Sequence, residues 1–178
     1  MGTRSRIGVM HGDVCKSVYC HWDGYLEHNG VILQEHYYDS AKANHLVSLG
    51  DISSLKRDVD FPDGEFHTFG SPMENVTVFY GRDRDEDGTD FATDHTFETF
   101  FDRANDCGAE WYYIMRDGVW YVGNTHENDA KYYRKLVLLL KALVDEMEVS
   151  KNWETVEGCQ VLQAGSFARH LRPAVRAR

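Results

Sequence analysis

Residues 4–22 read RSRIGVMHGDVCKSVYCHW, and this stretch decides the fold of the first part of the chain. Two runs rich in β-branched residues flank a Gly12-Asp13 pair. A two-residue turn between alternating strands predicts a β-hairpin. The expected register pairs His11 with Val14, Val9 with Lys16, Ile7 with Val18 and Ser5 with Cys20.

The polar side chains of this hairpin gather on one side, where the register sets Arg6 opposite Tyr19 and Arg4 opposite His21. Such groups are costly to bury without partners, so this side is expected to face solvent, a ligand or a protein. Arginine beside aromatic rings suits both anion contacts and protein interfaces. An ordinary sheet edge with cross-strand pairs is the alternative. The candidate binding residues are Arg4, Arg6, Tyr19, His21, Trp22, Asp23, Tyr25, Glu27 and His28.

The remaining pattern predicts an α+β fold. A second hairpin is expected over residues 110–123, around the turn pair Asp117-Gly118, with apolar side chains on both faces. One further strand is expected over residues 75–80. Together these give an antiparallel sheet built from two hairpins plus one strand, with helices packed mainly on one face. Helices are expected over residues 25–38, from Asp39 or Ser40 to Gly50, after Thr93 or Asp94, and over residues 128–147.

The 178 residues suit one domain, which we place at residues 1–149, with residues 136–144 as the deepest part of its core. Residues 150–178 are expected to form a weakly structured basic segment. Its arginines favour either a solvated tail or an arm that binds a partner or nucleic acid. They are Arg169, Arg172, Arg176 and Arg178.

The formal net charge of −10 should repel nucleic acid, so the main domain is not expected to bind it. The same charge favours basic partners. The four cysteines show no C-x-x-C spacing, which predicts reduced thiols in a cytosolic compartment. Neither a signal peptide nor a membrane-spanning segment is expected, because no apolar run has the required length. Self-association into a homodimer is left open.

An acidic segment follows the D-x-D-x-D-G pattern of a cation-binding loop. Carboxylates at alternate positions followed by glycine suit Ca²⁺, or Mg²⁺, because these ions prefer oxygen ligands. The alternative is a solvated acidic loop with internal ion pairs, and no resident cofactor. The candidate cation ligands are Asp83, Asp85, Asp87 and Asp94.

The sequence contains no complete catalytic set, which makes a non-enzymatic binding protein the leading hypothesis. A second hypothesis is an enzyme or binding protein for a small phosphorylated, nucleotide-like ligand. In that case Arg4, Arg6 and His21 would clamp the anion, with Asp23 or Glu27 as general base.

Two segments carry a resemblance to a known group of proteins. MGTRSRIG at residues 1–8 and YCHWDGYLEHNG at residues 19–30 resemble short proteins common in tailed bacteriophage genomes, which open with M-G-T-R and carry W-D-G-Y after the first hairpin. The resemblance implies a phage accessory protein that acts in the host cytoplasm. Such proteins often bind and inhibit a host enzyme or a defence complex. A role in the virion is a further alternative.

Overall fold

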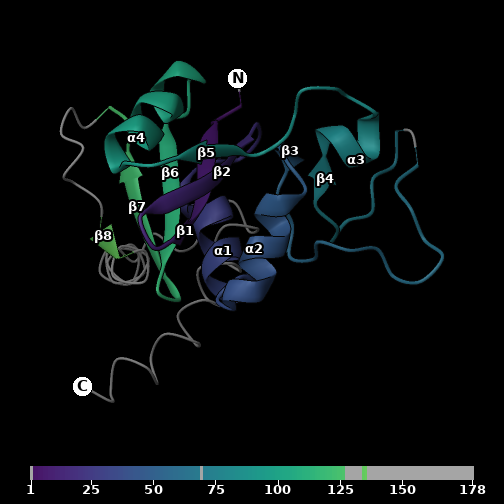
Figure 1. Ribbon diagram of the computed structural model, residues 1–178. Coiled ribbons are helices and arrows are strands. Elements are labelled where there is room, and N and C mark those ends of the chain that lie inside the picture. The colour runs from purple at the N-terminus through teal and green to yellow at the C-terminus, as the bar shows by residue number, and fades with distance from the viewer. Residues whose placement is uncertain (1, 69, 127–133, 136–178) are drawn as a thin grey trace, which may run out of the picture.

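The computed structural model describes residues 2–68, 70–126 and 134–135, the last two through their backbone alone. Its strands form a single mixed β-sheet, and the helices pack on that sheet (Figure 1). The strands are β1 (Ser5–His11), β2 (Val14–Cys20), β3 (Ile52–Ser54), β4 (Val78–Phe79), β5 (Ala92–Asp94), β6 (Trp111–Arg116), β7 (Val119–Asn124) and β8 (Arg134–Lys135). The helices are the π-helical turn η1 (Leu26–Gly30) and α1 (Val31–His36), α2 (Ser40–Ser48), α3 (Tyr80–Arg84) and α4 (Phe97–Asp106).

Both predicted hairpins are confirmed. β1 and β2 pair in the expected register, from Ser5 with Cys20 to His11 with Val14. The turn uses Gly12 at φ +60°, which a residue with a side chain would adopt only with strain. In the second hairpin both turn residues, Asp117 and Gly118, have positive φ, as a type I′ turn requires.

The prediction of a wholly antiparallel sheet is wrong. β6 pairs with β1 in the parallel direction, so the two hairpins join along their first strands. β3 also pairs with β2 in parallel, and the strand order is β4-β3-β2-β1-β6-β7-β8, with β5 beside β2. β6 therefore lies centrally, as its two apolar faces predicted.

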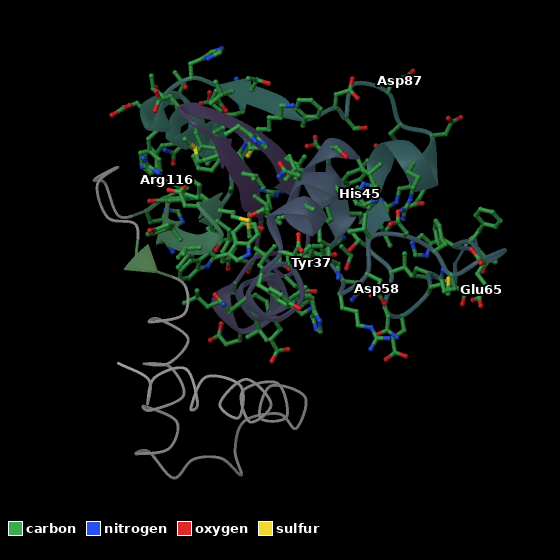
Figure 2. The ribbon with its side chains drawn as sticks, turned by 60° about the horizontal axis from the view of Figure 1, so that its bottom comes forward. Tyr37, His45, Asp58, Glu65, Asp87 and Arg116 are labelled. Carbon is green, nitrogen blue, oxygen red and sulfur yellow. The ribbon has the colours of Figure 1, made fainter. Side chains whose placement is uncertain are left out.

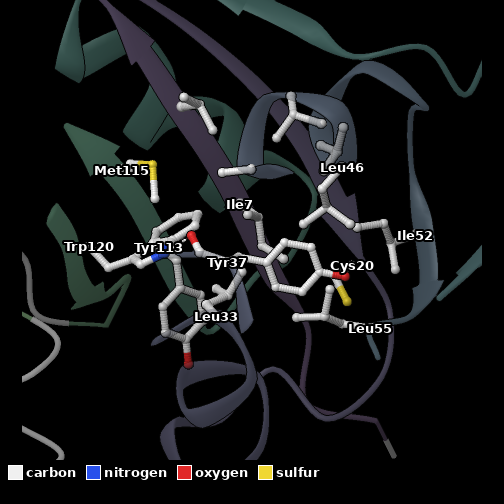
Figure 3. Packing of buried hydrophobic residues seen from close by; sticks show 14 of the residues in the cluster. Ile7, Cys20, Leu33, Tyr37, Leu46, Ile52, Leu55, Tyr113, Met115 and Trp120 are labelled. Atoms are coloured by element: carbon white, nitrogen blue, oxygen red, sulfur yellow. Dashed lines mark hydrogen bonds between the residues drawn. The ribbon is translucent and has the colours of Figure 1, made fainter. Parts of the chain in front are cut away.

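The inner face of the sheet carries the larger core. Ile7, Val18 and Tyr113 pack there against the helices η1, α1 and α2 (Figure 3). Trp120 lies in the same cluster and donates from Nε1 to the carbonyl oxygen of Tyr37 at 2.9 Å. Asp39 caps α2 as expected, because its carboxylate accepts from two amide groups of the first turn.

The outer face carries a second core, which the sequence analysis did not expect. Phe100 and Ala104 of α4 pack there on Tyr112 and Ile114 of β6, so helices cover both faces of the sheet. α4 begins later than predicted and is capped by Thr96, whose side chain accepts from the amide of Thr99.

Other boundaries also differ from the sequence analysis. The segment 51–72, for which no strand is expected, contains β3, whereas the strand expected at residues 75–80 is reduced to β4. The helix expected over residues 25–38 is divided into η1 and α1. The helix expected at 128–147, the core stretch 136–144 and the basic segment 150–178 lie outside the described residues, apart from β8. None of the described helices has the length and apolar character that crossing a bilayer requires.

Candidate functional site

The end of β2 and the residues after it carry a polar, aromatic surface, which we call the hairpin face and define as Arg4, Tyr19, His21 and Trp22. Tyr19 Oη lies 2.7 Å from Nδ1 of His21. The His21 ring meets the Trp22 ring edge-on, with centroids 4.6 Å apart. The guanidinium of Arg4 is a hydrogen-bond partner of the Tyr19 hydroxyl. The structure thus brings these four side chains together, although Arg4 and His21 lie just beyond the paired strands.

The electrostatics of Tyr19 connect the hairpin face with its surroundings. Burial raises the pKa of Tyr19, and the positive charge of Arg4 opposes that effect. Tyr80 of α3 and Cys107 at the end of α4 are also close enough to influence this pKa. Tyr19 therefore lies near Tyr80 of α3 and near Cys107 at the end of α4.

The two segments of the bacteriophage resemblance pack directly against each other. The amide of Gly24 donates to the carbonyl oxygen of Thr3 at 2.7 Å. A Cβ atom at Gly24 would lie 2.8 Å from the carbonyl oxygen of Arg4, and one at Gly2 would overlap the Trp22 ring. The small residues in M-G-T-R and W-D-G-Y therefore let the chain pass close to the start of β1 and support Trp22.

Arg6 corrects the expectation of an exposed anion clamp. Its side chain is buried beneath α4, although the register places it on the same side as Tyr19. Nε donates to Ser17 Oγ at 2.9 Å, and Nη2 donates to the carbonyl oxygen of Ser17 at 3.3 Å. Nη1 points to Cys107 Sγ at 3.9 Å. These contacts fix Arg6 between sheet and helix, where it supports the surface from below.

A cleft of about 540 Å³ lies beside α4, and we call it the α4 cleft. Its charged lining is dominated by carboxylates, with Arg6 and Arg103 as its only cations among the lining residues that the structure describes. The carboxylates are those of Asp51, Asp90, Asp102 and Asp106. This side of the surface is acidic, in keeping with the net charge.

Asp51 is a partly buried carboxylate of the α4 cleft whose pKa is shifted. Burial raises the pKa of its carboxyl above the ordinary value of 3.8. The Asp90 carboxylate acts in the same direction, whereas the amide of Tyr19 and the charge of Arg6 act against it. A carboxyl whose pKa is higher in the folded than in the unfolded chain destabilises the fold once it is ionised.

Replacing Asp51 with asparagine is therefore expected to stabilise the protein at pH 7. The amide oxygen can still accept from Tyr19, while the cost of burying a charge is removed. The gain should shrink as the pH falls through the range above 3.8, because the wild-type carboxyl becomes neutral there. Urea unfolding at several pH values measures it, with exposed Asp87→Asn as the control. A gain that did not change with pH would contradict this origin.

The other predicted binding residues follow the hairpin face in the chain. Asp23, Tyr25, Glu27 and His28 belong to η1 and the turn before it, whose residue Leu26 packs on the inner core. In the described part of the chain, neither Asp23 nor Glu27 forms a hydrogen bond or ion pair with the side chain of Arg4, Arg6 or His21. The pairing of an anion clamp with Asp23 or Glu27 as general base stays a prediction.

His28 itself has a structural environment. Burial lowers the pKa of its imidazole, and a hydrogen bond between Nδ1 and Asn29 Oδ1 at 2.9 Å opposes this. Asn29 is fully buried and donates to Ser5 Oγ at 3.1 Å. The polar groups of η1 therefore anchor this turn to β1.

A second hollow, of about 940 Å³, lies on the other side of the hairpin face, and we call it the Trp22 hollow. Trp22 and Ser53 line one side of it, and Arg84 of α3 lines another. Sequence reasoning missed Ser53 and Arg84, because nothing local indicated that β3 and α3 would meet the end of β2.

Arg82 and Asp83 build the wall of this hollow. The Arg82 guanidinium lies between the rings of Phe61 and Phe79, at 4.4 and 4.7 Å from their centroids. It donates to the carbonyl oxygens of Val59 and Thr77 and pairs with Asp83. These contacts tie α3 to the loop that precedes β4.

The four aspartates of the proposed cation loop do not converge. Asp83 Oδ2 accepts from the amide of Phe79 at 2.7 Å, and Asp94 is buried and bound by Arg103 through three hydrogen bonds. Asp85 and Asp87 are exposed, and Figure 2 shows Asp87 at the edge of the molecule. The described residues contain no group of three or more His, Cys, Asp or Glu side chains placed to hold a metal ion.

The cysteines of the described part are free thiols. Burial raises the pKa of Cys15 to about 12 and that of Cys20 to about 11. Both remain protonated at neutral pH, so neither provides a thiolate nucleophile.

Comparison of the chain with protein-family models, with curated proteins and with solved structures finds no match.

Proposed function

We propose that this chain is a bacteriophage accessory protein that binds a host or defence protein through the hairpin face. The observation that supports this most is the grouping of the Arg4, Tyr19, His21 and Trp22 side chains, which contact one another in sequence. Tryptophan, tyrosine and arginine contribute most of the binding energy in many protein interfaces.

The hairpin face has accessible side chains that a partner could bind, and hollows lie next to it. Arg4 is exposed and the Trp22 side chain is 44% exposed, so both are accessible to a partner. The α4 cleft and the Trp22 hollow lie beside the face. Anchors that stand beside hollows are typical of interface centres.

Charge favours a basic partner. The chain carries a net charge of −10, and the α4 cleft adds a local group of carboxylates beside the face. Opposite charges accelerate association and discourage wrong partners. Host proteins that bind nucleic acid carry basic surfaces of the kind that would suit this acidic face.

The resemblance of residues 1–8 and 19–30 to bacteriophage proteins supports the same function, since these segments meet at Trp22. The proposal includes that the protein acts in the cytoplasm of the bacterial host.

The experiment is a pull-down from bacterial host lysate with the tagged full chain, read by quantitative mass spectrometry. The double variant Arg4→Ala, Trp22→Ala should recover at least about tenfold less of the partner, because each side chain is of the type that costs about 2 kcal/mol or more at an interface centre. Recovery should also fall as salt is raised.

The matched control is Tyr38→Ala, which removes an exposed aromatic ring (68% exposed) outside the hairpin face. It should leave recovery unchanged. A partner that is lost equally with both variants, or with neither, would contradict the proposed face.

A further inference from the structure

The Trp22 hollow has the features of a small-molecule site. Its volume of about 940 Å³ lies within the usual range of ligand pockets, about 300–1,000 Å³. Its lining combines apolar surface from Trp22, Pro72 and Val78 with polar and charged groups from β3, α3 and the loop between them. In ligand pockets the apolar surface contributes binding and the polar groups fix the orientation of the ligand.

Trp22 supplies a held aromatic surface in this hollow. Its ring lies close to Gly2 and contacts the His21 ring at a steep interplanar angle, while the side chain stays 44% exposed. The Trp22 amide also donates to the carbonyl oxygen of Ser53 at 3.1 Å, which fixes the backbone. A supported tryptophan ring is suited to stack on a nucleobase.

Arg84 supplies a held cation on the same hollow. Its guanidinium lies over the Tyr80 ring at 5.0 Å and donates from Nη2 to Ser53 Oγ at 2.9 Å. It forms no ion pair with a carboxylate in the part of the chain that the structure describes. Because a guanidinium has five N–H groups, several donors remain for an anion.

Arg82, His67 and Asp83 are engaged by other groups of the hollow, and Asp85 is an exposed carboxylate on its rim. Arg82 is paired with Asp83, as described above. His67 accepts the amide of Met73 at Nδ1, at 2.9 Å, and its Nε2 lies 3.3 Å from the carbonyl oxygen of Thr77. Arg84 is therefore the group that can recognise an anion here. Ser53 accepts from the backbone amide of Trp22 at its carbonyl oxygen and from Arg84 at Oγ, so both residues are fixed to the same residue of β3.

From this geometry we infer that the Trp22 hollow binds a nucleoside monophosphate, with the base stacked on Trp22 and the phosphate bound by Arg84. The free nucleotide is favoured over a nucleic-acid strand, because the net charge of −10 repels a polyanion. The inference does not depend on the protein partner proposed above.

The test titrates the purified full chain with AMP, GMP, CMP and UMP, and measures binding by calorimetry and tryptophan fluorescence. At least one nucleotide should bind saturably and change the fluorescence. The matching nucleoside should bind at least about tenfold more weakly, since it lacks the charge-assisted hydrogen bonds to Arg84. Inorganic phosphate alone should bind more weakly still, since it cannot stack.

Two variants locate the site. Arg84→Gln should weaken nucleotide binding at least about tenfold, and Trp22→Ala should do the same, whereas Trp22→Phe keeps a ring and should lose less. The matched control is Arg116→Gln, an exposed arginine at the β6–β7 turn, far from Asp87 in Figure 2. Circular dichroism confirms that each variant is folded.

Absence of saturable nucleotide binding would overturn the inference. So would binding that Arg84→Gln and Trp22→Ala leave unchanged, or that Arg116→Gln weakens equally. Tighter binding of a single-stranded oligonucleotide than of any mononucleotide would overturn the choice of ligand. The test contains no host protein, so its failure leaves the pull-down result independent.

Discussion

Replacing Trp120 with alanine is expected to lower the free energy of unfolding by about 3–5 kcal/mol. The indole is only 2% exposed and fills the inner core beside Tyr113 and Met115 (Figure 3). Alanine would leave a cavity of nearly the whole ring. It would also leave the carbonyl oxygen of Tyr37 without the Nε1 donor.

Urea unfolding followed by far-ultraviolet circular dichroism measures this effect. Trp22→Ala is the matched control, because the same truncation at the half-exposed ring should cost less than about 1 kcal/mol. If Trp120→Ala does not fold, Trp120→Phe should fold with a loss of about 1–2 kcal/mol. Equal losses at Trp120 and Trp22 would contradict the described core.

The second large effect is expected for Asp83→Ala, at about 2–4 kcal/mol. Removing one partner of a buried ion pair typically costs about 3–5 kcal/mol, and the value here is lower because Arg82 is partly exposed. The substitution leaves the amide of Phe79 without its acceptor and Arg82 without its counter-ion. The wall of the Trp22 hollow should loosen with it.

Asp87→Ala serves as the control, since Asp87 is exposed in the same acidic segment, and it should change stability by less than about 0.5 kcal/mol. Asp83→Asn keeps an acceptor for Phe79 and should lose less than Asp83→Ala. Asp83 and Asp87 variants of equal stability would indicate a solvated loop instead of this ion pair.

The local parts of the fold could be predicted from the sequence. A short turn between alternating strands fixes the register of a hairpin, and both hairpins follow this rule. The parallel pairing of β1 with β6 joins residues about a hundred positions apart, and no local pattern specifies it. β3 was missed because three residues in a loop rich in Gly, Pro, Ser and Asp give too short a signal.

The candidate site shows the same division. Register alone predicted that Arg6 and Tyr19 share a side, and the structure agrees. It did not predict that α4 would cover Arg6, because the phenylalanine stripe of α4 indicates an apolar face but not the surface on which that face packs. Arg84 lines the Trp22 hollow because it contacts Ser53 and the Tyr80 ring, and only the tertiary structure shows these contacts.

The most direct test of the hairpin face is site-specific photocrosslinking inside bacterial host cells. A photoreactive phenylalanine derivative is placed at position 4 or 22 on the face, or at position 38 outside it, and adducts are identified by mass spectrometry. The account predicts one shared host or defence protein in the adducts from positions 4 and 22, and its absence from position 38. It would be contradicted by the same adducts from position 38, by crosslinks to a second copy of this chain alone, or by no adduct from either position on the face.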